Sequence, residues 1–248
     1  MPRKVRVENP GFYHIINRGV ERRKVFLSKE DKDEFIKILE EVFSIYEITL
    51  HSYVLMDNHY HLLIQNHKQN LSNAMRQLNS KYAIYFNKKY NRVGHLWQGR
   101  YKSWIIQNDN YFFTLFRYFE INPIKAKLTS KYGEYYRSFL YDLRHNSLLK
   151  SSQKSYFLNF NLEYLLSSLD IDFIDLDIQI LEKIKKENRN LKKELKFEEN
   201  IILDNSYSTK EERNKKIIEY YKKGVSQIKI AKLYNLTPSS ISKIIKKD

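Results

Sequence analysis

The first half of the chain switches repeatedly between the two hydrophobic periods that distinguish strands from helices. Residues 12–17 read as a short strand, and after Ser28 apolar side chains recur at the three- and four-residue spacing of a helix. Residues 48–56 and 59–65 then predict two strands joined by a two-residue turn, which is a hairpin. The apolar helical positions after Ser28 are Phe35, Ile38, Leu39, Val42, Phe43 and Tyr46.

The following segments continue this alternation. A helix is predicted over 71–90 and a strand over 100–107, with an irregular piece between them. A further helix is predicted over 110–121 and should end at Pro123, because proline disfavours helical geometry in the residue before it. The order β-α-β-β-α-β-α predicts an α+β domain over residues 1–150, with a mainly antiparallel sheet and helices packed on it, of ferredoxin-like type.

The second half is less regular. Residues 151–205 contain short aromatic pieces and a charged stretch, and they predict a helical extension or linker. Residues 206–248 predict an all-α helix-turn-helix domain, whose last two helices are joined by a turn at Asn235-Leu236 and approach closely at Ala231. A small helical packing domain is the alternative. Helix boundaries are expected at Gly224, Ser226 and Thr237, with Pro238 in the first turn, and the small core would be Ile228, Leu236, Ile241 and Ile244.

Charge narrows the choice of partner. Lys and Arg total 44 against 29 Asp and Glu, which gives the 248-residue chain a formal charge of +15. This excess favours a polyanionic partner, with nucleic acid the first choice and an anionic membrane surface the second. The absence of cysteine excludes disulfides and thiolate metal sites. No apolar run approaches the ~20 residues of a membrane-spanning helix, so we expect a cytoplasmic protein without membrane contact.

Two of the 7 histidines lie one residue apart, in the second strand of the predicted hairpin. Because side chains alternate across a strand, His59 and His61 should project from one face, while Tyr60 should project toward the core on the other. Imidazole is the commonest metal-binding side chain, so the pair could hold one ion. A pair of histidines on a half-exposed strand without a metal is the equal alternative.

A second candidate pair lies on the predicted helix before Pro123. Tyr118 and Asn122 are four residues apart and therefore share one helix face. The amide oxygen of Asn122 suits a hard divalent ion, and Tyr118 could attack a phosphate bound by that ion. Spacing alone favours the alternative, in which Tyr118 belongs to the core and Asn122 ends the helix.

Several ordered motifs resemble one family of enzymes. They are the strand VLMDNHYHLLIQ, the segment LWQGRYKSWIIQ and the helix YFEINPIKAKL, preceded by the opening PRKVRVENPGFYHIINRG. Together they resemble the HUH single-tyrosine transposases, above all the REP-associated tyrosine transposases, over about residues 2–130. Some relatives carry an added C-terminal helix-turn-helix, which residues 210–247 would supply. The chain departs at Asp57, Tyr60 and Glu120, where the family commonly has proline, a smaller aliphatic residue and a less acidic stretch.

This resemblance implies a role for each candidate residue. His59 and His61 would be paired ligands and Asn122 the third ligand of Mg²⁺ or Mn²⁺, while Tyr118 would be the nucleophile. Such enzymes cut single-stranded DNA by transesterification, leave a 5′-phosphotyrosine bond and a free 3′-hydroxyl, and rejoin strands by the reverse reaction. The family often works as a homodimer on hairpin or palindromic DNA. The predicted function is therefore that of a transposase-type endonuclease.

Two other functions stay open: a DNA-binding regulator with an inactive HUH domain, and a rolling-circle replication initiator or relaxase. DNA contacts are expected from two groups of side chains, one in the first domain for phosphates of the cleaved strand and one in the helix-turn-helix for duplex DNA. The first group is Arg22, Arg23, Lys24, Arg100 and Lys102. The second group is Gln227, Thr237, Ser239, Ser240, Ser242 and Lys243.

Overall fold

The computed structural model describes residues 8–106, 110–169, 182, 186–190, 207–222 and 227–245. The chain divides into two compact units, residues 1–188 and residues 189–248. The predicted charged extension within 181–200 lies mostly outside the described residues, as do the helix boundaries expected at Gly224 and Ser226. None of the helices in the described ranges is long and apolar enough to cross a membrane.

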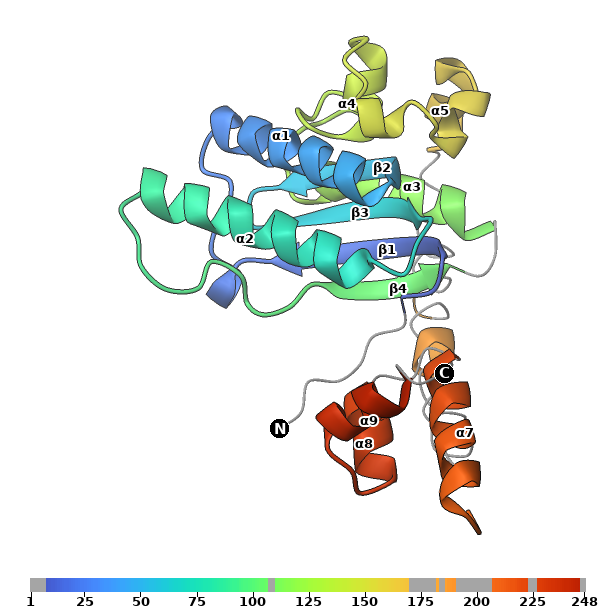
Figure 1. The fold of residues 1–248 in the computed structure, drawn as a ribbon. Helices are drawn as coiled ribbons and strands as arrows, with labels where there is room; N and C mark the ends of the chain where they lie inside the picture. The colour runs from blue at the N-terminus through green and yellow to red at the C-terminus, as the bar shows by residue number, and fades with distance from the viewer. Residues whose placement is uncertain are drawn as a thin grey trace. The chain divides into compact units, whose positions relative to one another are not determined.

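A four-stranded antiparallel sheet forms the centre of the first unit (Figure 1). Its order is β2-β3-β1-β4, so the hairpin of β2 and β3 lies beside β1, and β4 pairs with the other edge of β1. The α+β prediction with an antiparallel sheet is confirmed. The strands are β1 (Gly11–Arg18), β2 (Ile48–Met56), β3 (His59–Asn66) and β4 (Lys102–Ile106).

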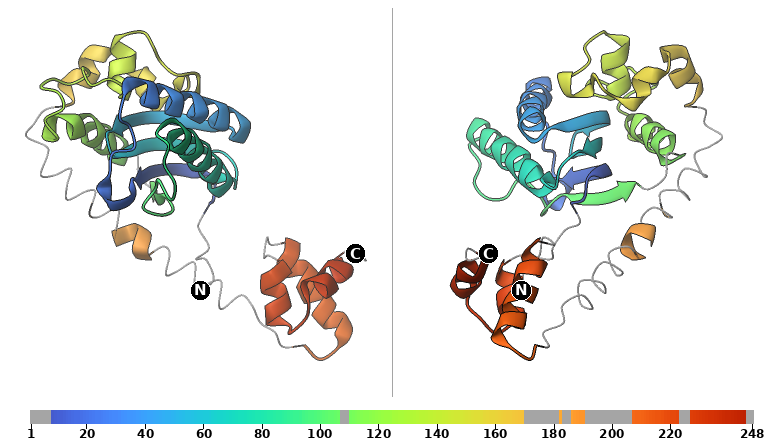
Figure 2. Two further views of the ribbon diagram at one scale, coloured as in Figure 1. Left: turned by 90° about the vertical axis from the view of Figure 1, so that its left-hand side faces the viewer. Right: turned by 45° about the vertical axis from the view of Figure 1, so that its right-hand side comes forward.

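Helices cover both faces of this sheet. In Figure 1 helices α1 (Lys29–Tyr46) and α2 (Leu71–Lys89) lie in front of the strands, and the right-hand view of Figure 2 shows α3 (Asn110–Lys125) on the opposite face. Tyr60 of β3 is fully buried beneath α1 and α2, where Phe35 of α1 contacts its ring at 5.0 Å. The hydroxyl of Tyr60 donates to Asn79 Oδ1 of α2 at 2.9 Å. The large side chain is thus accommodated in the core because its polar end is paired.

The start of α1 is fixed to the end of α2 by one buried carboxylate. Ser28 precedes α1, as the sequence indicates, and its backbone N–H donates to Asp31 Oδ2 at 3.1 Å. Lys89 Nζ donates to Asp31 Oδ1 at 2.6 Å, and the Tyr90 hydroxyl donates to Oδ2 at 2.7 Å. Asp31 is completely buried, and these donors together replace the water that its charge would otherwise need.

Pro123 does not end α3, so that prediction is wrong. The helix continues to Lys125, and Asn122 O still accepts the N–H of Ala126 at 2.9 Å. A proline so close to the C-terminal end removes only one intrahelical hydrogen bond. The side chain of Asn122 also donates through Nδ2 to Tyr118 O at 2.6 Å, which ties the last two turns together.

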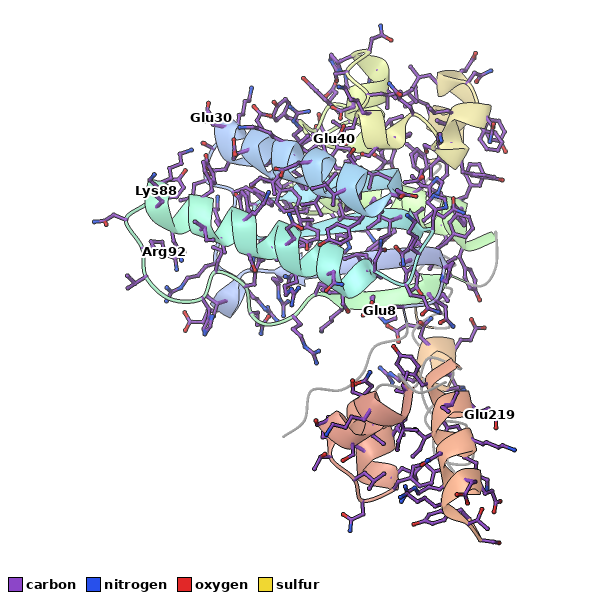
Figure 3. The ribbon with its side chains drawn as sticks, in the orientation of Figure 1. Glu8, Glu30, Glu40, Lys88, Arg92 and Glu219 are labelled. Carbon is purple, nitrogen blue, oxygen red and sulfur yellow. The ribbon has the colours of Figure 1, made fainter. Side chains whose placement is uncertain are left out.

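Residues 130–169 extend the same hydrophobic core. Their apolar side chains pack against the sheet and α3, and Phe139, Phe157 and Leu165 are completely buried. Glu40 of α1 lies on the side of the helix toward this segment, where its carboxylate accepts the N–H of Lys150 at 2.8 Å (Figure 3). The segment consists of α4 (Phe139–Arg144), the short helices η2 (Lys150–Ser152) and η3 (Tyr156–Asn159), and α5 (Leu162–Ser167).

The second unit contains α7 (Lys210–Lys222), α8 (Gln227–Leu233) and α9 (Pro238–Ile245). A turn joins α8 to α9, and within it Asn235 adopts a left-handed conformation with φ of 52°, which asparagine tolerates better than most residues. Ala231 is buried between the helices, as the sequence predicts. The core consists of Ile217, Tyr220, Ile230, Ala231, Tyr234 and Ile241, with Leu236 and Ile244 partly buried against it; the side chain of Ile228 lies outside the described residues.

Candidate active site

The two histidines of β3 project from the sheet face that α3 covers, which we call the histidine face. In the antiparallel ladder His59 pairs with Arg18 of β1, and His61 pairs with Ile16. The two imidazole rings lie 5.0 Å apart, and Tyr60 between them points to the opposite face. The strand alternation expected from the sequence therefore holds for this motif.

Each of these rings uses its Nδ1 atom within the protein. His59 Nδ1 lies 2.6 Å from Asn58 Oδ1, which can only accept, so His59 carries its proton on Nδ1. His61 Nδ1 lies 2.9 Å from Nε2 of His14, a histidine of β1 on the same face. Among the described residues, no hydrogen bond engages Nε2 of either ring. Nε2 of His59 therefore carries the lone pair that a metal ion requires, and Nε2 of His61 does so in the tautomer whose Nδ1 donates to His14.

Burial keeps both histidines neutral. It lowers the pKa of His59 to about 4, helped by the positive charge of Arg18. Burial also holds the pKa of His61 well below its ordinary value, and the neighbouring rings of His14 and His59 act in the same direction. At neutral pH both rings are thus uncharged, with one ring proton each, which is the form of imidazole that binds metals.

Helix α3 brings Tyr118 to the histidine face. The Tyr118 ring is half-buried and lies 5.3 Å from the His61 ring, in an edge-to-face arrangement. Asn122 follows one turn later, also half-buried, with Nδ2 directed to the backbone of Tyr118. This leaves Asn122 Oδ1 as a potential oxygen ligand, although no described contact joins it to either histidine.

The donor set fits a divalent cation held by two imidazoles and an amide oxygen. Within the described ranges, no three His, Cys, Asp or Glu side chains are grouped so that they could hold a metal ion. Asn122 Oδ1 is of a type suitable as a third ligand for Mg²⁺ or Mn²⁺ beside His59 and His61. The donation from His59 Nδ1 to Asn58 Oδ1 supports this fit, because metal-binding histidines generally donate their other ring N–H to an acceptor.

The basic residues expected to bind phosphate differ in position and in pairing. Arg23 lies 2.5 Å from Glu21, and Lys24 lies 2.9 Å from Asp57, so both cations already have an acidic partner. Lys102 is exposed on β4 opposite Ile16, which places it on the histidine face. The other two, Arg22 and Arg100, are also exposed.

In the second unit the predicted DNA contacts lie on α9 and at its N-cap, except for Gln227, which begins α8. Thr237 Oγ1 accepts the N–H of Ser240 at 3.1 Å and lies 2.9 Å from the Ser240 hydroxyl, so these two residues form the N-terminal cap of the helix. Ser239 and Lys243 are exposed, whereas Gln227 and Ser242 are half-buried. Ser239 and Lys243 are therefore the two of these that remain most available to a ligand.

Two residues of this site were not predicted from the sequence, namely His14 and Arg18 of β1. Each belongs to the predicted strand or its end, but its proximity to His61 or His59 depends on the register between β1 and β3. Side-chain alternation fixes the face of each strand separately and leaves this register open. The available signal was the alternation His14, Ile16, Arg18, which puts these residues on one face of β1.

Glu120, two residues after Tyr118, anchors α3 to α4. Its carboxylate accepts the N–H of Leu140 at 3.1 Å and the hydroxyl of Ser138 at 3.0 Å. Burial raises the pKa of Glu120 from 4.5 to about 7, because these two donors offset only part of the lost hydration.

The free energy of unfolding should depend on pH because of Glu120. Between pH 4.5 and 7 the folded state binds the Glu120 proton more tightly than the unfolded state, so the free energy of unfolding falls as pH rises. Across this pH range, Glu120 should lower the free energy of unfolding by on the order of 3 kcal/mol. Glu120→Gln retains an acceptor and a donor but cannot ionise, so this decrease should be absent in the variant. Urea denaturation of both proteins at pH 5 and pH 8 measures the difference. Equal pH dependence in both would contradict the assignment.

The part of the chain that carries this site matches a known protein family. Residues 10–122, which include β1 to β4, both histidines and the Tyr118 helix, match the family described as "Transposase IS200 like". Over these residues the chain is similar to the IS200-like transposases. We call the first unit the transposase unit after this match.

Two solved structures are similar to this chain, each with 18% sequence identity. One is described as a REP-associated tyrosine transposase bound to a REP hairpin; the match covers 60% of this chain and 88% of that chain, with a TM-score of 0.48. The other is described as a candidate transposase from Deinococcus radiodurans R1; the match covers 48% of this chain and 95% of that chain, with a TM-score of 0.35. Among curated proteins, none matches the chain.

Proposed function

We propose that the transposase unit nicks and rejoins single-stranded DNA, with Tyr118 as the nucleophile. One observation carries this proposal: the Tyr118 ring lies 5.3 Å from the ring of His61, on the face where His59 and His61 keep both Nε2 atoms available. A nucleophile beside a metal-binding pair is the arrangement that phosphodiester cleavage requires.

The reaction is a transesterification at one phosphodiester. The phenolic oxygen of Tyr118 forms a bond to phosphorus and loses its proton to solvent, while the bond from phosphorus to the 3′-oxygen breaks and this oxygen takes up a proton. The products are a 5′-phosphotyrosine and a free 3′-hydroxyl, and the same hydroxyl or one of another strand can reverse the step. Mg²⁺ or Mn²⁺, held by His59, His61 and Asn122, would neutralise the phosphate oxygens. A homodimer is proposed from the family resemblance alone.

The test is a reaction of the full chain with single-stranded hairpin DNA and either ion, analysed on a denaturing gel. Because the 5′-phosphate becomes attached to the protein, a label at the 3′ end should move with the protein, and a label at the 5′ end should appear in a shorter free strand. DNA binding without either product, in Mg²⁺ and in Mn²⁺, would contradict the proposal and favour a DNA-binding regulator with an inactive domain.

We propose that the second unit binds duplex DNA as a helix-turn-helix. The support is the left-handed Asn235 in the turn, the buried Ala231 between α8 and α9, and the exposed side chains of Ser239 and Lys243 on α9. A second helix entering the major groove would present its N-terminal residues to bases and phosphates.

Deleting residues 206–248 should weaken duplex binding roughly 10-fold or more, since it removes one group of phosphate contacts. Ser239→Glu combined with Lys243→Glu should have a similar effect in the full chain, because both residues are exposed and outside the small core. Electrophoretic mobility shifts with duplex DNA at fixed salt measure the change. Duplex affinity that stays the same in both variants would refute the role of this unit.

A further inference from the structure

Arg18 is the charged residue nearest to the histidine pair in the sheet. It ends β1 and pairs directly with His59 in the antiparallel ladder, which continues one step further through the hydrogen bond from Gly19 N to Asn58 O at 2.9 Å. Directly opposed side chains have Cβ atoms about 5 Å apart on the same face.

Gln98 holds the Arg18 guanidinium without neutralising it. Arg18 donates through Nε and Nη2 to Gln98 Oε1, at 3.0 Å and 2.7 Å, and Arg18 O accepts the N–H of Gln98 at 2.9 Å. No carboxylate of the described residues forms an ion pair with Arg18, in contrast to Arg23 and Lys24. Two of the five guanidinium N–H groups are used by Gln98, so three remain for a ligand.

The segment that carries Gln98 is itself tied to the domain. Leu96 is buried, and its carbonyl accepts the N–H of Val20 at 2.9 Å. Trp97 donates through Nε1 to Asn79 O of α2, also at 2.9 Å. These contacts give the sequence LWQG a function beyond connecting α2 to β4, because they fix the amide that orients Arg18.

We propose that Arg18 binds a non-bridging oxygen of the phosphodiester cleaved beside His59 and His61, and that Gln98 is its positioning residue. This inference rests on the proposed nicking reaction and names the group that binds its substrate. A phosphate beside the histidine pair gains negative charge on its oxygens as Tyr118 attacks. An oriented guanidinium of undiminished charge stabilises that transition state more than the ground state.

The experiment compares single-turnover adduct formation by variants of Arg18 and Gln98 in the full chain with that of a control variant. Arg18→Gln should lower the rate about 10²- to 10³-fold, the usual loss for one removed transition-state donor. Arg18→Lys keeps the positive charge but lacks the planar guanidinium with its several N–H donors, so the rate should fall roughly 10-fold. Gln98→Ala should lower the rate by a similar factor. The matched control is Arg76→Gln on α2, whose guanidinium also donates to a side-chain amide oxygen but lies away from the histidine face.

A substrate with a neutral methylphosphonate at the cleaved position separates phosphate binding from a structural role. Because its non-bridging charge is absent, the deficits of Arg18→Gln and Gln98→Ala should shrink to less than about 5-fold relative to the unmodified protein. A variant that merely misfolds would remain equally impaired on both substrates. Gln98→Glu, which would neutralise Arg18 in place, should be at least as impaired as Gln98→Ala on the natural phosphodiester.

The outcomes distinguish this inference from the proposed function. If the unmodified protein forms no adduct, the nicking reaction itself is wrong. If it forms the adduct and Arg18→Gln stays within about twofold of Arg76→Gln, the role of Arg18 is overturned. Equal deficits on phosphodiester and methylphosphonate substrates would overturn it as well, since the guanidinium would then act through the fold.

Discussion

Replacing Tyr118 with phenylalanine is expected to abolish the covalent protein–DNA adduct, with a loss of ~10⁴-fold or more, because a removed nucleophile has no substitute in the site. The change deletes only the hydroxyl. The ring can keep its edge-to-face contact with His61 and its contact with Phe119 at 6.2 Å, so the fold should be unaffected. Denaturing gels with 3′-labelled hairpin DNA measure the loss.

Tyr111→Phe provides the matched control for that experiment. Tyr111 lies on the same helix but is buried, and its hydroxyl donates to Glu187 at 3.1 Å. Its variant should form the adduct at close to the unmodified rate. An adduct that persists in Tyr118→Phe would remove Tyr118 from the reaction and leave the histidine pair without its proposed nucleophile.

Replacing His59 with alanine is expected to weaken Mn²⁺ binding by roughly 100-fold or more. Loss of hydrogen bonds around a metal site already costs 10- to 100-fold, and here an actual ligand is removed. His59 is half-buried and is the first residue of β3, so its removal disturbs the core less than removal of the fully enclosed His61. Asn122→Ala should weaken binding as well, since it removes the amide oxygen.

Electron paramagnetic resonance of free Mn²⁺ measures these affinities without any DNA reaction. His67→Ala is the control, because His67 is exposed at the far end of the hairpin and its Nε2 contacts only Thr49 Oγ1 among the described residues, at 3.0 Å. An affinity for Mn²⁺ that is equal in His59→Ala, His67→Ala and the unmodified protein would rule out the metal site.

The sequence was informative where structure depends on a local period. The alternation in β3 correctly separates His59 and His61 from Tyr60, because each strand residue faces opposite to its neighbour. The helical spacing after Ser28 likewise identifies the buried face of α1. These repeats of apolar side chains did not predict the strand order of the sheet or the contact of Tyr118 with His61.

Local patterns in the sequence could not predict contacts between segments that lie far apart along the chain. His14 meets His61 across 47 residues, and Arg18 meets Gln98 across 80 residues. Both depend on strand register and on the path of a loop, which are set by the whole core. Pro123 shows a limit of a local rule: the rule predicted that α3 ends there, but the helix continues to Lys125 because a proline near the C-terminal end removes only one hydrogen bond.

The most direct test of Tyr118 as the nucleophile is to locate the DNA linkage by mass spectrometry. Trypsin cleaves after Arg117 and Lys125, and the resulting peptide of residues 118–125 contains Tyr118 as its only tyrosine. After nuclease digestion of the adduct, we expect this peptide to carry a nucleotide that is linked through its 5′-phosphate to Tyr118. A nucleotide on any other of the 20 tyrosines, or on another residue type, would contradict it.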